Sequence, residues 1–321
     1  MLDSCRDHGA ARTETASELL HKPPFSAITD SIGQFPADAQ LYLRRAALLS
    51  QTNNHQVAMF DYQKAWSLAP NEETGILYAA NLAILGMNKE RLGVLEVCLK
   101  KFPGNSGFIR LMGEAYADLG DSKQALELYS AMLQKDSADF ETWYEKGLLM
   151  ENMLDTFSAI DALRKAYTLK PLHTYGLELA HLYAESSNAE CLNICDEILT
   201  QDPMKELVDP FFIKGIYYSN KGKFNQAIIQ FDSCIRRDWK YTDAYIEKGI
   251  AFFKQKNYDE ALNTFRMAST VSNTDPDAYF WMGRCYETLK KADEAIVQYE
   301  RALGLEKNFK EAREALQRLQ P

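Results

Sequence analysis

The sequence predicts an all-α protein in which eight helix pairs stack, in chain order, into a solenoid. A small residue recurs every 33 to 35 residues, at Ala46, Ala79, Gly113, Gly147, Ala180, Gly215, Gly249 and Gly283. A larger, mostly aromatic or aliphatic residue follows each one 15 or 16 positions later, at Tyr62, Leu95, Tyr129, Leu163, Cys195, Phe231, Phe265 and Tyr299. Around both registers the apolar residues keep the i, i+3, i+4, i+7 spacing of one helix face. One helix pair cannot bury such a stripe alone, so neighbouring pairs must stack.

The N-terminal segment divides into a tail and one helix. Residues 1–22 lack periodicity and are rich in polar and small residues, so we expect a disordered tail. Residues 23–36 begin with two prolines, which suit a first helical turn, and end at Pro36, one repeat before Pro70. This segment is therefore expected to be a leading half-repeat helix.

The repeats are expected to fill residues 39–308. Gly120 and Gly222 fall between the two helices of their repeats, where glycine readily ends the first helix. After the last repeat, residues 309–319 place Ala312 and Leu316 on one face with charged residues around it. A terminal capping helix needs this pattern, and a partner-binding tail is the alternative.

The two registers resemble those of the tetratricopeptide repeat family. The third repeat carries the family's bulky, small and aromatic positions at Ile109, Gly113, Tyr116, Ala125 and Tyr129, and the seventh carries them at Tyr245, Gly249, Phe252, Ala261, Phe265 and Ala268. The resemblance implies a tetratricopeptide-type α-solenoid, a right-handed superhelix of stacked antiparallel helix pairs. Two repeats depart from the pattern: Gly75 and Arg91 in the second, and Gly176 with a turn one residue short in the fifth. These two repeats are expected to be distorted.

The first residues leave the cellular location open. Leu2-Asp3-Ser4-Cys5 resembles the end of a bacterial lipobox, in which a small residue precedes an acylated cysteine. Asp3 is unusual in such a box, and no apolar signal core precedes it. Lipidation of Cys5 would make the protein a lipid-anchored component of the bacterial cell envelope, and without it the protein would be cytoplasmic.

Composition and motifs disfavour several classes of function. The formal net charge of −9 argues against nucleic-acid binding, which needs clustered Lys and Arg. No run of 18 apolar residues is present, so no transmembrane segment is expected. The sequence contains no nucleophile-elbow, P-loop, dinucleotide-binding or zinc-ligand motif, so neither catalysis nor a cofactor is expected.

Histidines and cysteines offer the remaining alternatives. An enzyme would have to rest on His173 and His181, for which a solvated polar contact is the simpler interpretation. Cys191 and Cys195 would share one helix face, as a metal or redox pair or, more simply, as two small buried residues.

The family resemblance also indicates where a partner would bind, because positions 5 and 9 of each first helix line the concave channel in that family. Position 5 is apolar through the last three repeats, position 9 is apolar in the sixth and seventh, and position 12 adds Phe253 in the seventh. The candidate partner-binding residues of the groove are Arg110, Tyr144, Phe212, Ile216, Ile246, Ile250, Phe253, Phe280 and Arg284. An exposed apolar stripe would grip a peptide through hydrophobic pockets. The alternative is that the neighbouring repeat buries these side chains.

One known mode of the family is not matched. Some members bind a C-terminal carboxylate with Lys and Asn at fixed positions, and no three consecutive repeats here supply that set. Arg110 at position 5 is expected to pair with Glu114 at position 9. Asp209, Asp243 and Asp277 at position 2 suit helix N-termini and would repel an anionic tail.

The sequence therefore predicts a non-enzymatic scaffold or adaptor that holds a peptide or partner protein in the groove of a helical superhelix. The alternative is a lipid-anchored envelope component that organises surface or secretion machinery through the same array.

Overall fold

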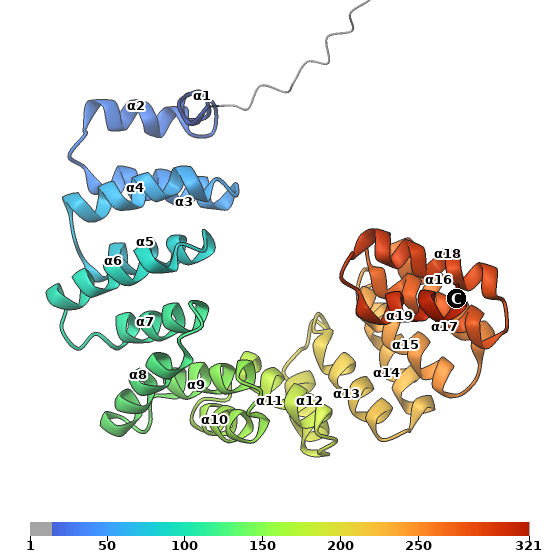
Figure 1. The fold of residues 1–321 in the computed structure, drawn as a ribbon. Helices are drawn as coiled ribbons and strands as arrows, with labels where there is room; N and C mark the ends of the chain where they lie inside the picture. Colours follow the sequence, from blue (N-terminus) through green and yellow to red (C-terminus); the bar gives the residue numbers. More distant parts are fainter. Residues whose placement is uncertain (1–14, 321) are drawn as a thin grey trace, which may run out of the picture. The chain divides into compact units, whose positions relative to one another are not determined.

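The structure is a computed structural model that describes residues 15–320. Within that range it contains nineteen helices, α1 to α19, and no strand. The chain divides into two compact units, an N-terminal unit that ends at Met153 and a C-terminal unit that begins at Leu154. Figure 1 shows the helices following one another in chain order within each unit.

From residue 15 onward, the N-terminal unit is built from nine helices. Their bounds are α1 Ala16–Leu20, α2 Ser26–Gln34, α3 Ala39–Gln51, α4 His55–Leu68, α5 Glu72–Ile84, α6 Asn88–Lys101, α7 Ser106–Asp118, α8 Ser122–Lys135 and α9 Phe140–Asn152. Three helix pairs form, α3 with α4, α5 with α6 and α7 with α8, and the second helix of each pair packs on the next first helix.

The C-terminal unit continues the same arrangement. Its helices are α10 Thr156–Leu169, α11 His173–Glu185, α12 Glu190–Thr200, α13 Asp209–Asn220, α14 Phe224–Arg237, α15 Thr242–Lys254, α16 Tyr258–Val271, α17 Pro276–Thr288, α18 Ala292–Leu305 and α19 Lys310–Leu319. Four pairs form, from α11–α12 to α17–α18, and consecutive first helices α11, α13, α15 and α17 also touch one another. The predicted all-α solenoid is confirmed.

The small-residue register works by close approach of two helices. An added Cβ on a first-helix glycine would overlap the aromatic ring that the paired second helix presents to it. The pairs are Gly113 with Tyr129, Gly215 with Phe231, Gly249 with Phe265 and Gly283 with Tyr299. All four rings are at most 1% exposed, so each fills the space beside its glycine at native packing density.

The segment between the two helices of each repeat contains one left-handed residue. That residue has φ between 57° and 80° and is Asn53, Gly86, Gly120, Leu154, Ser187, Gly222, Lys256 or Lys290. Glycine adopts this conformation without steric cost, and other residues pay a penalty because Cβ approaches the following carbonyl. Five of the eight turns carry a residue other than glycine.

The two repeats that depart from the pattern are accommodated differently. In the second repeat α5 and α6 keep 13 and 14 residues, so these helices are not shortened. Arg91 is 2% exposed, and its guanidinium reaches α7, donating to Glu114 at 2.6 Å and to Asp118 at 3.3 Å. In the fifth repeat α12 has 11 residues, three fewer than α14, and the segment that follows it, residues 201–208, is longer than the segment between α14 and α15.

A buried ion pair stabilises the N-terminal end of the array. Arg45 on α3 donates two hydrogen bonds of 2.7 Å to Asp61 on α4, and both side chains are less than 10% exposed. The same guanidinium donates to Thr29 Oγ1 on α2 at 3.0 Å. Phe25 and Ile32 are buried against the first repeat, so α2 contributes to its core.

The expected tail lies mostly outside the described residues, as does Cys5. The described end of that tail differs from the expectation, because Ala16–Leu20 form the short helix α1. The side chain of Thr15 caps the Glu18 amide and the carboxylate of Glu18 accepts from the Thr15 amide, which satisfies two of the helix's free N–H groups.

Candidate groove and pocket

The groove face of the C-terminal unit, defined as positions 2, 5, 6, 9 and 12 of the first helices α11, α13, α15 and α17, is only partly open. Phe212, Ile216, Ile250, Phe253 and Arg284 are half-buried, as a ligand-contacting side chain would be in the free protein. Ile246 and Phe280 are 8% and 7% exposed and belong to the core. Consecutive first helices touch, so the position-5 side chains of the last two repeats are covered by their neighbours rather than free.

Phe212 lines a real cavity on this face. A pocket of about 390 Å³ opens between α11 and α13. The residues that line it are Thr174, Leu177, Glu178 and His181 of α11, Asp209, Phe212 and Ile213 of α13, and Tyr241, which precedes α15. Leu177, Phe212 and Ile213 are its apolar groups, and the other five side chains are polar. We call this cavity the Phe212 pocket.

Aromatic packing fixes the shape of the Phe212 pocket. The Phe212 ring lies 5.9 Å from the Phe231 ring and 5.3 Å from the Tyr241 ring, centroid to centroid. Tyr241 in turn donates from its hydroxyl to Asp209 Oδ1 at 3.3 Å. Burial, followed by the charge of Asp209, raises the pKa of Tyr241, which keeps its hydroxyl protonated as a donor. The pocket is therefore preformed.

A second feature of this face lies on α17. The Arg284 guanidinium carbon stands 5.8, 5.9 and 5.6 Å from the ring centroids of Phe253, Phe280 and Trp281. Such contacts hold a cation by the negative faces of the rings. Phe253 and Trp281 are themselves packed edge to face at 5.6 Å. Arg284 is thus positioned by aromatic rings and not by a carboxylate partner within 4 Å among residues 15–320.

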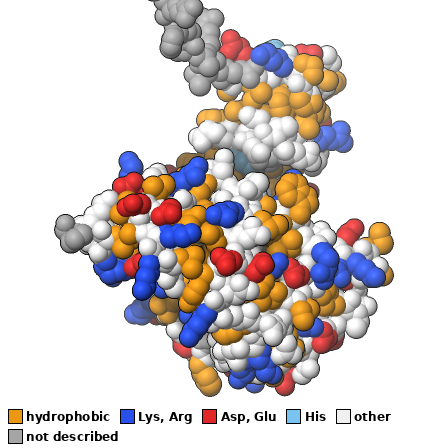
Figure 2. All heavy atoms as spheres, turned by 90° about the vertical axis from the view of Figure 1, so that its right-hand side faces the viewer, with side chains coloured by type: hydrophobic (Ala, Val, Ile, Leu, Met, Phe, Trp, Pro, Cys, Tyr) orange, Lys and Arg blue, Asp and Glu red, His pale blue; other side chains and the backbone are white. Residues whose placement is uncertain are grey.

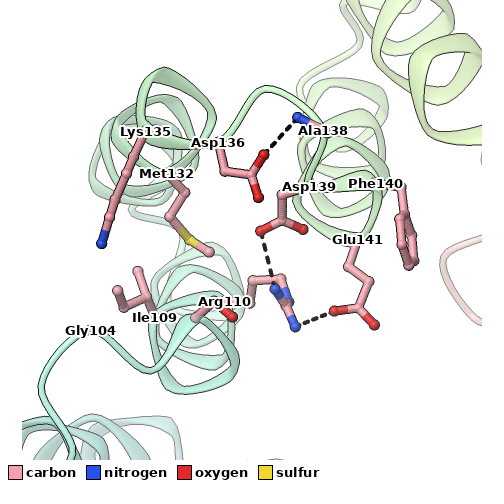
Figure 3. A pocket seen from close by; sticks show the side chains of 11 residues that line it. Gly104, Ile109, Arg110, Met132, Lys135, Asp136, Ala138, Asp139, Phe140 and Glu141 are labelled. Carbon is pink, nitrogen blue, oxygen red and sulfur yellow. Dashed lines mark hydrogen bonds and ion pairs between the residues drawn. The ribbon is translucent and has the colours of Figure 1, made fainter. Parts of the chain in front are cut away.

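In the N-terminal unit Arg110 lies in a different setting from the one expected. A pocket of about 580 Å³ opens between the ends of α7, α8 and α9, with Ile109, Met132 and Phe140 among its lining residues. Figure 3 shows the guanidinium of Arg110 placed between Asp139 and Glu141. It pairs with Asp139 at 3.3 Å and with Glu141.

The expected pair of Arg110 with Glu114 is therefore wrong. Glu114 accepts from the buried Arg91 instead. Because water does not reach that guanidinium, it needs a carboxylate as its counter-charge. Tyr144, the other candidate of this unit, is half-buried on α9.

The structure separates the groups that the sequence left as possible catalysts. His173, at the start of α11, faces Gln201 with Nε2 3.1 Å from its Oε1, while His181 lines the Phe212 pocket. Cys191 and Cys195 are fully buried, and burial raises the pKa of their thiols to about 11 and about 12. They pack as small apolar residues. In the described part of the chain no set of three or more His, Cys, Asp or Glu side chains is arranged to hold a metal ion.

Surface and helix composition add two findings. On the face drawn in Figure 2, basic and acidic side chains are interleaved with hydrophobic ones. Between residues 15 and 320, no helix combines the length and the apolar character that crossing a bilayer requires.

Sequence registers found some of the pocket and missed the rest. Phe212 is the one lining residue among the candidate groove residues; Leu177 and His181 occupy positions 5 and 9 of α11, and Asp209 occupies position 2 of α13. Tyr241 was missed because it belongs to the turn before α15, where no helical register applies. Glu178 at position 6 was missed because that position was not assigned to the groove; its spacing three residues before His181 was the available signal.

Comparison with solved structures shows what this chain is similar to. It aligns with a chain of the APC/C hetero-tetramer Cut9–Hcn1 at 18% identity and a TM-score of 0.56, over 91% of this chain and 57% of that chain. It aligns with PilW, a type IV pilus biogenesis factor, at 16% identity and a TM-score of 0.57, over 66% of this chain and 99% of that one. A tetratricopeptide repeat protein from Parabacteroides merdae aligns at 14% identity and a TM-score of 0.50, over 88% of this chain and 99% of that one. This chain spans little more than half of the Cut9–Hcn1 chain, and identities this low establish the fold alone. No match was found among curated protein sequences.

Sequence models of the tetratricopeptide repeat match residues 39–72, 214–270 and 252–319. The matched segments include the repeats that contain Ala46, Gly215, Gly249 and Gly283, in the register that the structure explains by helix packing. Motif, packing and the sequence models agree, and residues 39–72 and 214–319 of this chain belong to the tetratricopeptide repeat family.

Proposed function

We propose that this protein is a non-catalytic adaptor that holds a segment of a partner protein on the groove face of its C-terminal unit, with the Phe212 pocket as the anchor. The fold is that of protein-interaction scaffolds in general, and the pocket is the observation that carries the finer proposal. It combines three apolar side chains with polar groups that line the same cavity, so it offers a ligand side chain both apolar contact and hydrogen-bond partners.

The extent of burial decides which side chains of the groove face can contact a ligand. Leu177 and Phe212 are half-buried and line the pocket, so a ligand side chain placed there would remove their remaining surface from water. Ile246 and Phe280 contribute to the stability of the array instead, because they have almost no surface left to cover.

The experiment compares two matched double variants of the full chain in pull-down of the partner from its source. Leu177→Ser with Phe212→Ser removes the pocket floor, whereas Ile229→Ser with Val297→Ser removes two side chains that are 58% and 55% exposed on second helices. Capture should be lost in the first variant and retained in the second, while far-UV circular dichroism remains helical in both. Equal capture by both would reject the pocket as the anchor.

A further inference from the structure

The groove face of the C-terminal unit carries a row of carboxylates beside its apolar groups. Asp209, Asp243 and Asp277 occupy position 2 of successive first helices, and Glu178 and Glu247 occupy position 6. Asp209 and Glu178 also line the Phe212 pocket, so the row begins at the proposed anchor.

These carboxylates lack basic partners within the described residues. None of the five has a Lys, Arg or His nitrogen within 4 Å in residues 15–320. Two lysines of the same first helices pair with other carboxylates. Lys214 pairs at 2.5 Å with Asp196 on α12, and Lys248 pairs at 2.7 Å with Asp232 on α14. These two carboxylates of second helices are therefore neutralised, whereas the five carboxylates of the row are not.

The helix dipole explains only part of this row. Asp209, Asp243 and Asp277 lie in the first turn of their helices, where a negative charge is stabilised by the N-terminal partial charge. Glu247 and Glu178 lie a turn further on, where that stabilisation has fallen off. Burial, followed by the charges of Asp243 and Asp277, raises the pKa of Glu247 to about 7. The carboxylates thus repel one another across adjacent repeats, and an added cation would relieve that repulsion.

The apolar groups next to the row suit the stems of long basic side chains. Lys and Arg lay their methylene groups on apolar surface while their charged ends reach acceptors, and a cation is attracted to an aromatic face. Phe212 and Tyr241 provide such rings beside Asp209. Arg284 is the one Lys or Arg at the defined groove positions of α11, α13, α15 and α17. A phosphate-bearing partner would therefore be repelled by the carboxylate row.

We infer that the occupant of this face is a basic peptide segment of a partner protein, in which Lys or Arg residues are interspersed with apolar ones. This inference rests on the proposed function and specifies its ligand: apolar side chains fill the Phe212 pocket, and basic side chains pair with the carboxylate row.

The test is a selection of random linear peptides on the immobilised full-length protein, followed by fluorescence anisotropy with the recovered peptides at physiological salt. Two variants with the same substitutions, two Asp→Asn and one Glu→Gln, are compared. Asp209→Asn, Asp243→Asn and Glu247→Gln neutralise the groove row. Asp259→Asn, Glu260→Gln and Asp293→Asn neutralise exposed carboxylates in the first turns of the second helices α16 and α18. Circular dichroism checks that both variants are folded.

We expect recovered peptides enriched in Lys or Arg next to apolar residues, with affinity about tenfold weaker for the groove variant and nearly unchanged for its control. Basic peptides that lose affinity equally in both variants would reflect the net charge of −9 and would overturn the inference. Neutral or acidic peptides that depend on Leu177 and Phe212 would overturn it too, while the proposed function would stand. If no peptide depends on Leu177 and Phe212, the proposed function itself fails.

Discussion

Gly283 of α17 faces the ring of Tyr299 of α18 so closely that a Cβ on the glycine would stand 2.6 Å from Tyr299 Cε1. The hydroxyl of the same ring donates to Glu287 at 2.6 Å, one turn further along α17. Tyr299 therefore cannot retreat from an added methyl group without breaking a hydrogen bond. This relationship is the physical reason for a glycine at that position of the repeat.

Replacement of Gly283 by Ala should destabilise the C-terminal unit. The methyl group must displace a ring that is fully buried, and overpacking of this kind costs about 1–3 kcal/mol. Gly304→Ala in α18 is the matched control, because nothing lies within 4 Å of its Cβ position and alanine is favoured over glycine in a helix. Urea unfolding followed by circular dichroism should give a lower midpoint for the first variant only.

Leu154 offers a substitution in the opposite direction. It has φ of 61° and is 88% exposed, so it carries left-handed strain with little packing in return. Leu154→Gly should stabilise the protein by about 1 kcal/mol, because relief of the left-handed penalty exceeds the entropic cost of glycine in the unfolded chain. Leu154→Ala keeps the strain and should show no such gain in thermal unfolding. An equal gain from both would attribute the effect to removal of an exposed apolar side chain.

The buried pair of Arg45 and Asp61 should be sensitive to loss of one partner. Asp61→Asn leaves a guanidinium that is 9% exposed without its counter-charge, and breaking a buried pair typically costs about 3–5 kcal/mol. Lys165 and Asp161, an exposed pair on α10, provide the comparison, since Asp161→Asn should cost about 0–1 kcal/mol. Similar losses in guanidinium unfolding would show that Arg45 is solvated after the change.

Stability should fall as pH rises through the range in which Glu247 ionises. The folded-state pKa is about 7, above the ordinary value of 4.5, so the folded protein binds more protons than the unfolded chain between these values. The contribution is present below pH 4.5 and is lost as pH rises through 7. Glu247→Gln should flatten this part of the stability curve, while Glu260→Gln on the exposed start of α16 should leave it unchanged. Parallel curves for Glu247→Gln and the parent would contradict this assignment.

The fold was predictable because its determinants repeat. Each glycine-and-ring pair is local to one repeat, so the spacing between Gly113 and Tyr129 recurs through the chain and reveals the helix pair without knowledge of distant contacts. The partner of Arg91 was not predictable in this way. Glu114 and Asp118 lie on the next repeat, and their choice depends on which side chains are desolvated once α6 and α7 pack.

The groove face was predictable in outline but not in detail. Helical periodicity places Phe212, Ile246 and Phe280 on the same side of their first helices, and it predicts the same exposure for all three. Their burial differs because the neighbouring helices differ. Phe309 packs on Phe280 with ring centroids 4.9 Å apart, whereas Phe212 borders a cavity. Such differences arise from three-dimensional packing, which a repeat register does not contain.

The contact of Thr29 with the guanidinium of Arg45 has a consequence for where the folded array can begin. A shortened protein that starts at the first full repeat would lack one of three acceptors of a cation that water scarcely reaches, together with the apolar cover that Phe25 and Ile32 supply. Its exposed apolar end would promote aggregation, and its first helix pair would unfold locally. The leading helix is thus an integral part of the first repeat, and truncation after it would open the array from that end.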